Sequence, residues 1–314
     1  MDGGLKEKKM NGIEIVSTGY AKIEKTLDNQ QLEQMVETSN EWIVSRTGIL
    51  KRHLSDKSSA FLAIEAAKKA TQNQDLSQLA LIIVATMTPE NNTPSNACLV
   101  QKALGLNHQS MMCFDINVAC SGYVYALKVA QSLLEENQYG LVIGSEQLSS
   151  IVDYQDRNTC ILFGDGAAAA LIKKNQKLFY SYLDSDGNEE VLFSKRNDYL
   201  KMKGQDVFKF AVHALPSATN KALKIANVKS EDLHMIFPHQ ANVRIIESAA
   251  KRIHVPLEKF YMNLQRFGNT SSASVGLALG EALEKGMVKK GDLIALTGFG
   301  AGLTYGSIVM KWAY

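Results

Sequence analysis

The second half of the chain repeats the first. Residues 81–85 resemble 234–238, residues 119–135 resemble 271–285, and residues 141–144 resemble 293–296. The members of each pair lie roughly 152 residues apart, close to half of the 314-residue chain. Any α/β chain yields single pairs of this kind, but three pairs in register favour duplication of a β/α unit.

Strand-like apolar runs alternate with amphipathic segments in both halves. Residues 79–85 and 140–144 are typical of buried strands, residues 114–118 of a shorter strand, and residues 121–136 of a helix. This alternation predicts an α/β protein. We therefore expect two similar halves, 10–172 and 173–314, which form one pseudo-symmetric unit rather than two separable domains.

Charge and hydropathy exclude several classes of protein. The chain has 34 Lys plus Arg and 32 Asp plus Glu, a balance that argues against a dedicated nucleic-acid binder. The longest apolar runs, 79–84 and 167–172, fall far short of the roughly 20 residues that cross a membrane. The start, residues 1–9, is polar and rich in lysine with no apolar core behind it, which predicts a cytoplasmic protein without a secretory signal. Because Met10 offers a second start, residues 1–9 are interpreted as an expression remnant or a flexible start.

One of the four cysteines lies where a reactive thiol is expected. None of the four has C-x-x-C spacing, so zinc and thioredoxin-type sites are weak interpretations. Cys120 follows a strand candidate and directly precedes the predicted helix, with Gly122 permitting a sharp turn. A helix N-terminus favours the thiolate, so we predict a lowered pKa for Cys120, and the same backbone N–H groups can bind an oxyanion. The remaining cysteines are interpreted as small buried hydrophobic residues: Cys98, Cys113 and Cys160.

A histidine and an asparagine lie in two comparable loops of the second half. His239 follows the strand candidate 234–238, and Asn269 lies in the small-residue loop 266–274 before a helix. Through the duplication, that loop is the counterpart of the Cys120 turn, so we predict that the three side chains converge. Cys, His and Asn support acyl transfer through a thioester, and a papain-like hydrolase uses the same residue types. Alternatively, His239 and Asn269 merely cap helices.

These segments closely resemble the β-ketoacyl-acyl-carrier-protein synthase III family of the thiolase-like superfamily. The resemblance extends from about Met10 to Trp312, with three motifs in the family's order and spacing: A-C-S-G at Cys120, P-H-Q-A-N at His239 and G-N-T-S at Asn269. Three further segments also resemble family signatures: 39–48, 163–166 and 298–306.

The resemblance implies a fold and a reaction. The fold is a thiolase-like five-layer α-β-α-β-α arrangement of two similar halves, and the protein is a homodimer. Cys120 takes the acyl group of an acyl-coenzyme A. Malonyl carried by acyl carrier protein then loses carbon dioxide and attacks the acyl-cysteine, which initiates type II fatty-acid synthesis. No metal and no permanently bound cofactor is expected, because coenzyme A arrives with the substrate.

The resemblance also implies residue roles. His239 and Asn269 stabilise the negative charge of the decarboxylating thioester, and the backbone N–H groups of Cys120 and Ala301 hold the oxyanion. Coenzyme A is expected to contact Trp42, Arg46, Arg157, Gly204 and Asn242. A patch for the acidic carrier protein consists of Lys209, Arg244, Lys251 and Arg252. The plainer interpretations are core packing for Trp42 and solvated surface charges for the basic residues.

Three features depart from the family's pattern. Ala301 stands where most relatives have glycine, and the segment 184–200 is short. Thr93 occupies a position that lines the partner subunit's primer pocket in relatives, so a small residue there predicts room for a branched or longer primer. Three alternative functions remain: a specialised condensing enzyme or acyltransferase of secondary metabolism, a Cys-His-Asn hydrolase, and a non-catalytic relative that binds carrier protein.

Overall fold

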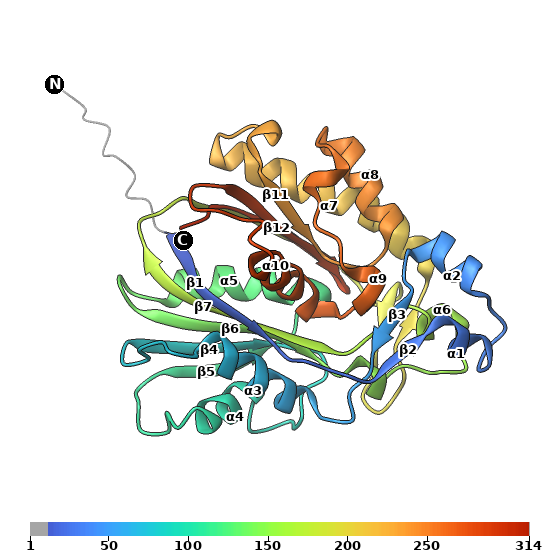
Figure 1. Cartoon of the computed structure of the whole chain (residues 1–314), viewed down its shortest axis with the longest axis horizontal. Helices are drawn as coiled ribbons and strands as arrows, with labels where there is room; N and C mark the ends of the chain where they lie inside the picture. Colours follow the sequence, from blue (N-terminus) through green and yellow to red (C-terminus); the bar gives the residue numbers. More distant parts are fainter. Residues whose placement is uncertain (1–11, 314) are drawn as a thin grey trace.

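Two large sheets form the centre of the protein, with helices between and outside them (Figure 1). The computed structural model describes residues 12–313. The predicted remnant or flexible start, residues 1–9, lies outside the described residues. None of the helices in residues 12–313 is long and apolar enough to cross a membrane.

The first sheet has the strand order β1-β7-β6-β4-β5. Its strands are β1 (Gly12–Tyr20), β4 (Leu79–Ala85), β5 (Met112–Ile116), β6 (Tyr139–Glu146) and β7 (Gly166–Asn175). β4 pairs in parallel with β5 and β6, whereas β7 is antiparallel to β6 and β1. The central strands are covered on both faces, which explains their nearly continuous apolar sequences.

The second sheet has the strand order β11-β12-β13-β8. Its strands are β8 (Phe179–Asn188), β11 (Met235–Pro238), β12 (Leu293–Gly300) and β13 (Gly302–Lys311). They follow the same order as β4, β6, β7 and β1 of the first sheet. The place of β5 is taken by a single parallel bridge between Ile236 and Phe260. The predicted duplication is therefore confirmed at the level of the sheets.

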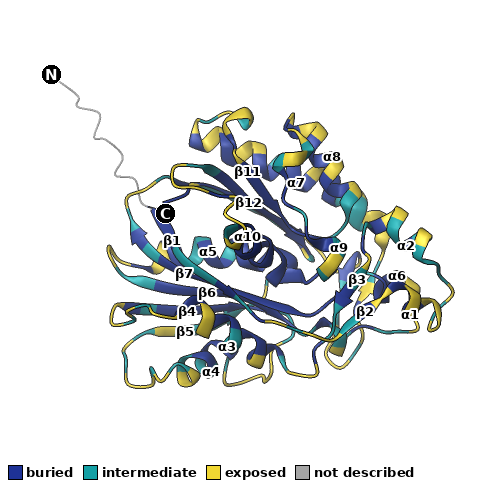
Figure 2. Ribbon diagram, in the orientation of Figure 1, coloured by how far each residue is buried: buried dark blue, intermediate teal, exposed yellow. Residues whose placement is uncertain are grey.

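Helices lie between the sheets and over their outer faces (Figures 1 and 2). α5 (Gly122–Leu133) and α10 (Ser274–Glu284) share one buried core with both sheets. α3 (Ser59–Ala70) and α4 (Asn96–Ala103) pack on the first sheet, and α7 (Gly204–Ala226) and α8 (Val243–Ile253) on the second. The predicted five-layer thiolase-like fold is confirmed.

A smaller group of elements packs beside one end of the sheets (Figure 1). Its strands are β2 (Thr26–Asp28), β3 (Lys51–His53), β9 (Leu192–Phe193) and β10 (Lys201–Met202), and its helices are α1 (Asn29–Glu33), α2 (Asn40–Thr47), α6 (Arg157–Cys160) and α9 (Leu264–Phe267). The fully buried Arg52 joins parts of this group by donating to Leu27 O at 3.1 Å and Asn29 Oδ1 at 2.9 Å. These contacts tie β3 to β2 and to the start of α1.

Two short 3-10 turns introduce the central helices. η1 (Ala119–Ser121) leads into α5, and η5 (Ser271–Ala273) leads into α10. The helix predicted over 121–136 is therefore shorter, because Leu134 is already extended and the next residues turn toward β6. Each turn contains a non-glycine residue in the left-handed region, Ala119 with φ 42° and Ser271 with φ 46°. Such conformations are unfavourable by about 1–3 kcal/mol and are often found at functional sites.

Candidate active site

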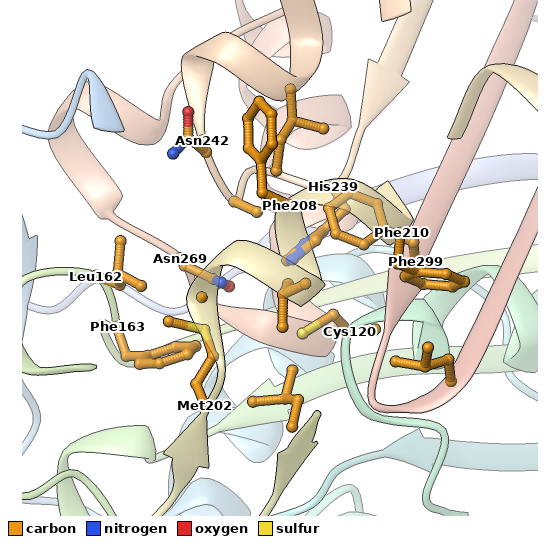
Figure 3. A pocket seen from close by; sticks show the side chains of 17 residues that line it. Cys120, Leu162, Phe163, Met202, Phe208, Phe210, His239, Asn242, Asn269 and Phe299 are labelled. Carbon is orange, nitrogen blue, oxygen red and sulfur yellow. The ribbon is translucent and has the colours of Figure 1, made fainter. Parts of the chain in front are cut away.

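A cavity of about 150 Å³ is lined by Cys120, His239 and Asn269 (Figure 3). Cys120 comes from η1 of the first half, and the other two come from the second half. The rest of the lining is mostly apolar, and it includes Leu162, Phe163, Leu192, Met202, Val207, Phe208, Phe210, Ile245, Phe299 and Leu303. The structure therefore brings a thiol, an imidazole and a carboxamide to one water-poor site.

Cys120 is buried between the two halves. Its turn begins after β5, and the end of β12 packs directly against it: a β-carbon added to Gly300 would lie 2.7 Å from the Cys120 backbone nitrogen. Burial raises the pKa of the Cys120 thiol to about 12, although a hydrogen bond with Ser271 acts in the opposite direction. The predicted lowering of this pKa is wrong, because the second half removes the thiol from solvent and helix position alone does not compensate.

His239 directly follows β11 and is 1% exposed. Its backbone N–H donates to Thr297 O at 2.8 Å, and its ring lies edge-on to Phe299 with centroids 5.1 Å apart. The ring atom Nδ1 lies 2.7 Å from Ser274 Oγ at the start of α10. Burial lowers the pKa of His239 to about 3, so the imidazole is neutral near pH 7.

The buried side chain of Gln240 secures the loop after His239. Its Nε2 donates to Pro238 O at 2.8 Å and to Tyr261 O at 3.0 Å, while its Oε1 accepts from Asn263 N at 3.0 Å. Each polar atom of the carboxamide thus has a backbone partner. The orientation of the loop is accordingly fixed independently of any ligand.

The backbone of Asn269 is held against the segment between α6 and β7. Its N–H donates to Leu162 O at 2.8 Å, and its carbonyl accepts from Gly164 N at 3.0 Å. The side-chain Oδ1 accepts from Ser271 N at 2.9 Å. Because Oδ1 is used in this way, Nδ2 is the end of the carboxamide that can donate to a ligand in the cavity.

A buried carboxyl group that the sequence interpretation missed lies behind Cys120. Glu146 ends β6 and is fully buried. Its oxygens accept from Ser272 Oγ at 2.8 Å, Thr88 Oγ1 at 2.7 Å and Met87 N at 3.1 Å, and Ser271 Oγ lies 3.3 Å away. A carboxylate directly after a buried strand is the signal that could have found it, because strand ends carry the chemistry of α/β proteins.

The first turns of α7 and α8 border the cavity, and α2 packs against α8. Gly204, the first residue of α7, and Asn242, the N-cap of α8, belong to its lining. Asn242 Nδ2 donates to Arg46 O at 2.8 Å, which ties α8 to α2. The guanidinium carbons of Arg157 and Arg46 lie 5.0 Å and 5.9 Å from the centre of the Trp42 ring. The structure thus places an aromatic ring and two cations together near the cavity entrance.

Family models and relatives agree on one family. The model described as 3-oxoacyl-[acyl-carrier-protein] synthase III matches residues 114–187, and the model of its C-terminal part matches residues 223–312. The β-ketoacyl-[acyl-carrier-protein] synthase III of Fusobacterium nucleatum is 52% identical, with 97% of this chain and 100% of that protein covered. The crystal structure of the Aquifex aeolicus 3-oxoacyl-[acyl-carrier-protein] synthase III is similar at a TM-score of 0.92 and 41% identity, covering 96% of this chain and 100% of that one. The Pseudomonas aeruginosa synthase III structure gives a TM-score of 0.90 and 33% identity, covering 96% and 99%.

The chain belongs to the β-ketoacyl-acyl-carrier-protein synthase III family. It is therefore an acyltransferase that initiates fatty-acid synthesis. The predicted family, enzyme class and function are confirmed by these comparisons.

The basic residues predicted to form one patch in this synthase III lie on α7 and α8. Arg244 and Lys251 are seven residues apart on α8, hence on one face and about 10 Å apart along its axis. Arg244 packs over Phe208 at 5.5 Å, and Arg252 pairs with His213 at 2.9 Å. Lys209 forms an exposed ion pair with Asp206 at 3.3 Å.

Two other predicted residues of this synthase III lie outside the cavity lining. Ala301 connects β12 to β13, one residue beyond the Gly300 that packs on Cys120, and it is partly buried. Thr93 is exposed in the segment between β4 and α4. Within residues 12–313, no three His, Cys, Asp or Glu side chains are grouped so as to bind a metal ion.

Proposed function

We propose that this synthase III joins the acyl group of an acyl-coenzyme A to malonyl-acyl carrier protein, with release of coenzyme A and carbon dioxide. The acyl group is carried on Cys120 between the two steps. The observation that supports this proposal is the single apolar cavity that contains the thiol, the imidazole and the carboxamide.

In the first step, the Cys120 sulfur attacks the thioester carbonyl. The carbonyl oxygen becomes an oxyanion, which the backbone N–H groups of Cys120 and Ala301 stabilise. Close packing of Gly300 on Cys120 supports this arrangement, because it brings the β12–β13 connection to the nucleophile. Since backbone donors act here, an alanine at position 301 serves as well as glycine.

In the second step, His239 and Asn269 stabilise the enolate formed on loss of carbon dioxide. We assign Ser274 as the donor in its 2.7 Å contact with His239 Nδ1, which puts the ring proton on Nε2. Asn269 offers Nδ2. Each such donor contributes about 3 kcal/mol to transition-state stabilisation. The apolar walls exclude water, which protects the acyl-enzyme from hydrolysis.

Coenzyme A binds across the entrance. Its adenine lies between Trp42 and Arg157, whose guanidinium carbon is 5.0 Å from the Trp42 ring centre, and Arg46 meets the phosphates. The pantetheine arm passes Gly204 and Asn242 on its way to Cys120. Coenzyme A and the carrier protein then use the same entrance, because both carry the reacting acyl group on a pantetheine arm.

The acidic carrier protein docks on Lys209, Arg244, Lys251 and Arg252. A basic patch of this kind is compatible with the net charge of +2, because an acidic partner is attracted by the local electrostatic potential near the entrance and not by the net charge of the protein. Charge-reversal variants of these residues are expected to raise the KM for malonyl carrier protein and not the KM for acyl-coenzyme A.

Further proposals concern the assembly. We propose a cytoplasmic homodimer in which Thr93 of one subunit borders the primer pocket of the other. No permanently bound cofactor or metal takes part. We also propose two halves in each subunit, 10–172 and 173–314, a division that is supported by the short connection between β7 and β8 at residues 176–178.

The test is a two-stage labelling experiment. The protein is incubated with labelled acetyl-coenzyme A, and malonyl-acyl carrier protein is then added. Labelled acyl-enzyme that becomes labelled 3-oxoacyl carrier protein is the expected result. Release of labelled acetate alone would identify a hydrolase, and absence of labelling would identify a non-catalytic relative. Comparison of acetyl-, isobutyryl- and longer acyl-coenzyme A tests the role proposed for Thr93. A strict preference for acetyl would contradict the space that a small residue is predicted to leave in the primer pocket.

A further inference from the structure

A fully buried arginine contacts the segments that lead to Trp42 and to Arg157. Arg52 lies in the middle of β3, and burial lowers its pKa to about 10, so its guanidinium is still charged near pH 7. In the part of the chain that the structure describes, no Asp or Glu side chain forms an ion pair with it, and its Nε has no hydrogen-bond partner. Burial of such a charge is costly. The groups that the guanidinium does contact therefore indicate what it contributes.

One side of the guanidinium leads to α2. Arg52 Nη1 donates to Asn29 Oδ1 at 2.9 Å. Asn29 is itself buried, and its Nδ2 donates to Asn40 Oδ1 at 3.0 Å and to Ile49 O at 2.8 Å. Asn40 is the first residue of α2, and Ile49 follows the C-cap of that helix. A single carboxamide thus holds both ends of the helix that carries Trp42.

The other side of the guanidinium leads to α6. Its Nη2 donates to the carbonyl oxygen of Ile161, which is the C-cap of α6. Ile161 also packs in one buried apolar cluster with Ile43 of α2. Arg157 is the first residue of α6, and its Nη1 donates to Glu37 O at 2.9 Å in the segment before α2. The two helices that carry Trp42 and Arg157 are therefore connected through the buried guanidinium as well as at the surface.

We propose that Arg52 and Asn29 form a buried bridge that holds α2 and α6 at the spacing required by the adenine ring of coenzyme A. This inference rests on the proposed binding of that ring between Trp42 and Arg157. Neither residue of the bridge lines the cavity, so both are positioning residues that act through the two helices.

The spacing matters because adenine enters between two groups that are already close. The guanidinium carbon of Arg157 lies 5.0 Å from the centre of the Trp42 ring. A flat ring between them requires about 7 Å, twice the roughly 3.5 Å at which carbon atoms are in contact. The exposed side chain of Arg157 must therefore move and give up its contact with Glu37 O. The buried bridge keeps the backbone of α2 and α6 in place during this movement, so little binding energy is lost in ordering the chain.

The forked shape of arginine is what the bridge uses. Nη1 and Nη2 of Arg52 donate to partners in different segments, and the single nitrogen of a lysine cannot occupy both positions. Arg52→Lys therefore keeps the positive charge but breaks the bridge, whereas Arg52→Met removes both. If the buried charge merely attracts the phosphates of coenzyme A, only Arg52→Met weakens binding. If the bridge operates, both variants weaken it.

The experiment compares acylation of Cys120 by acetyl-coenzyme A and by acetyl-pantetheine, which has the same thioester but no nucleotide. Arg52→Lys, Arg52→Met and Asn29→Ala are each expected to raise the KM for acetyl-coenzyme A about tenfold, since the cation–π contacts of adenine are weakened. The kcat for acetyl-coenzyme A and the kcat/KM for acetyl-pantetheine are expected to stay unchanged. Calorimetry of coenzyme A binding measures the same loss without the chemical step. Arg52→Met combined with Asn29→Ala loses no more than either alone, because both residues belong to one path.

Lys174→Met is the matched control for Arg52→Met. Lys174 is also buried, and its ammonium donates to Gln131 O near the end of β7, outside α2, α6 and the bridge. The control is expected to leave the KM for both thioesters unchanged. Thermal unfolding of every variant shows that folded proteins are compared. If Arg52→Met does not fold, Arg52→Lys and Asn29→Ala provide the test.

Three results would overturn the bridge: unchanged affinity for coenzyme A in the Arg52 variants, a loss in Arg52→Met alone, or equal losses with both thioesters. Failure of the underlying site has a different signature. If the unsubstituted protein binds coenzyme A no more tightly than pantetheine, the proposed adenine site is wrong and the bridge falls with it. If the unsubstituted protein shows that preference and the variants keep it, only the bridge is wrong.

Discussion

The turn that carries Cys120 and the turn that carries Ser271 and Ser272 are equivalent in backbone but not in function. Each begins with an asparagine whose Oδ1 accepts from the N–H two residues later, Asn117 at 3.4 Å and Asn269 at 2.9 Å. Each then has a residue with positive φ and leads into a central helix. Cys120 faces the cavity, whereas the equivalent Ser272 bonds Glu146.

The strand ends that contact these turns differ in the same way. β6 and β12 are both eight residues long, so Glu146 and Gly300 occupy matching last positions. Gly300 packs on the Cys120 turn, and Glu146 bonds the Ser271 and Ser272 turn. The comparison indicates that the first copy of the unit supplies the nucleophile and the carboxyl group that supports the opposite turn, and that the second copy supplies the donors.

Exchanging the nucleophile between the turns is the strongest test of this difference. Cys120→Ala is expected to lower acyl-enzyme formation at least about 10⁴-fold. Adding Ser272→Cys does not restore it, because position 272 lies outside the cavity. Restored labelling in the double variant, followed by mass spectrometry, would show that the two turns are functionally interchangeable.

The two asparagines test whether the donor function belongs to one half. Asn269→Ala is expected to lower decarboxylation of malonyl carrier protein about 100-fold, since one oxyanion donor is lost. Asn117→Ala lowers it by no more than a few-fold, because Asn117 lies in a separate exposed hollow. Carbon dioxide release from pre-acylated enzyme measures both, and similar losses would refute the assigned asymmetry.

Two matching glycines show how tightly β6 and β12 pack on the turn of the opposite half. A β-carbon on Gly144 would fall on the backbone carbonyl of Ser272, whereas one on the matching Gly298 would lie 3.1 Å from Ser121 Cα. Gly144→Ala is therefore expected to lower the free energy of unfolding by about 3 kcal/mol, and Gly298→Ala by about 1 kcal/mol. Urea unfolding measures both values, and a reversed order contradicts the packing described.

The smallest expected effect concerns stability at position 146. Burial raises the pKa of Glu146 above its ordinary value of 4.5, so its ionisation disfavours the fold as pH rises through that raised pKa. Glu146→Gln should accordingly raise the melting temperature at pH 8 and leave it nearly unchanged at pH 4. The gain is about 1.4 kcal/mol for each unit by which the pKa is raised. Equal melting temperatures at pH 8 would mean that the carboxyl group is not strained by burial.

Much of the fold can be predicted from the sequence, because each copy of the repeat is recognised from short apolar runs and motifs. Apolar periodicity places the strands, and the shared order of motifs places the turns that carry Cys120 and Asn269 at adjoining strand ends. The convergence of these residues with His239 depends on rules for strand ends that do not require side-chain detail.

The pKa values and the buried carboxyl group of the site could not be predicted from the sequence. The raised pKa of Cys120 results from burial, and one of the residues packed against Cys120 is Gly300, which is 180 residues away in the sequence. In the sequence, Glu146 is an ordinary polar residue at the end of a strand. Its burial depends on the turn that carries Ser271 and Ser272, which is distant in the sequence. Positive φ at Ala119 and Ser271 likewise has no local signal, since neither residue is glycine or asparagine.

The most direct test of the account is peptide mass spectrometry of the protein after incubation with acetyl-coenzyme A. The account predicts one acetyl group, on the peptide that contains Cys120, and its disappearance with formation of 3-oxoacyl carrier protein when malonyl carrier protein is added. Acetylation of Cys98, Cys113 or Cys160 instead, or loss of the acetyl group to water alone, would contradict it.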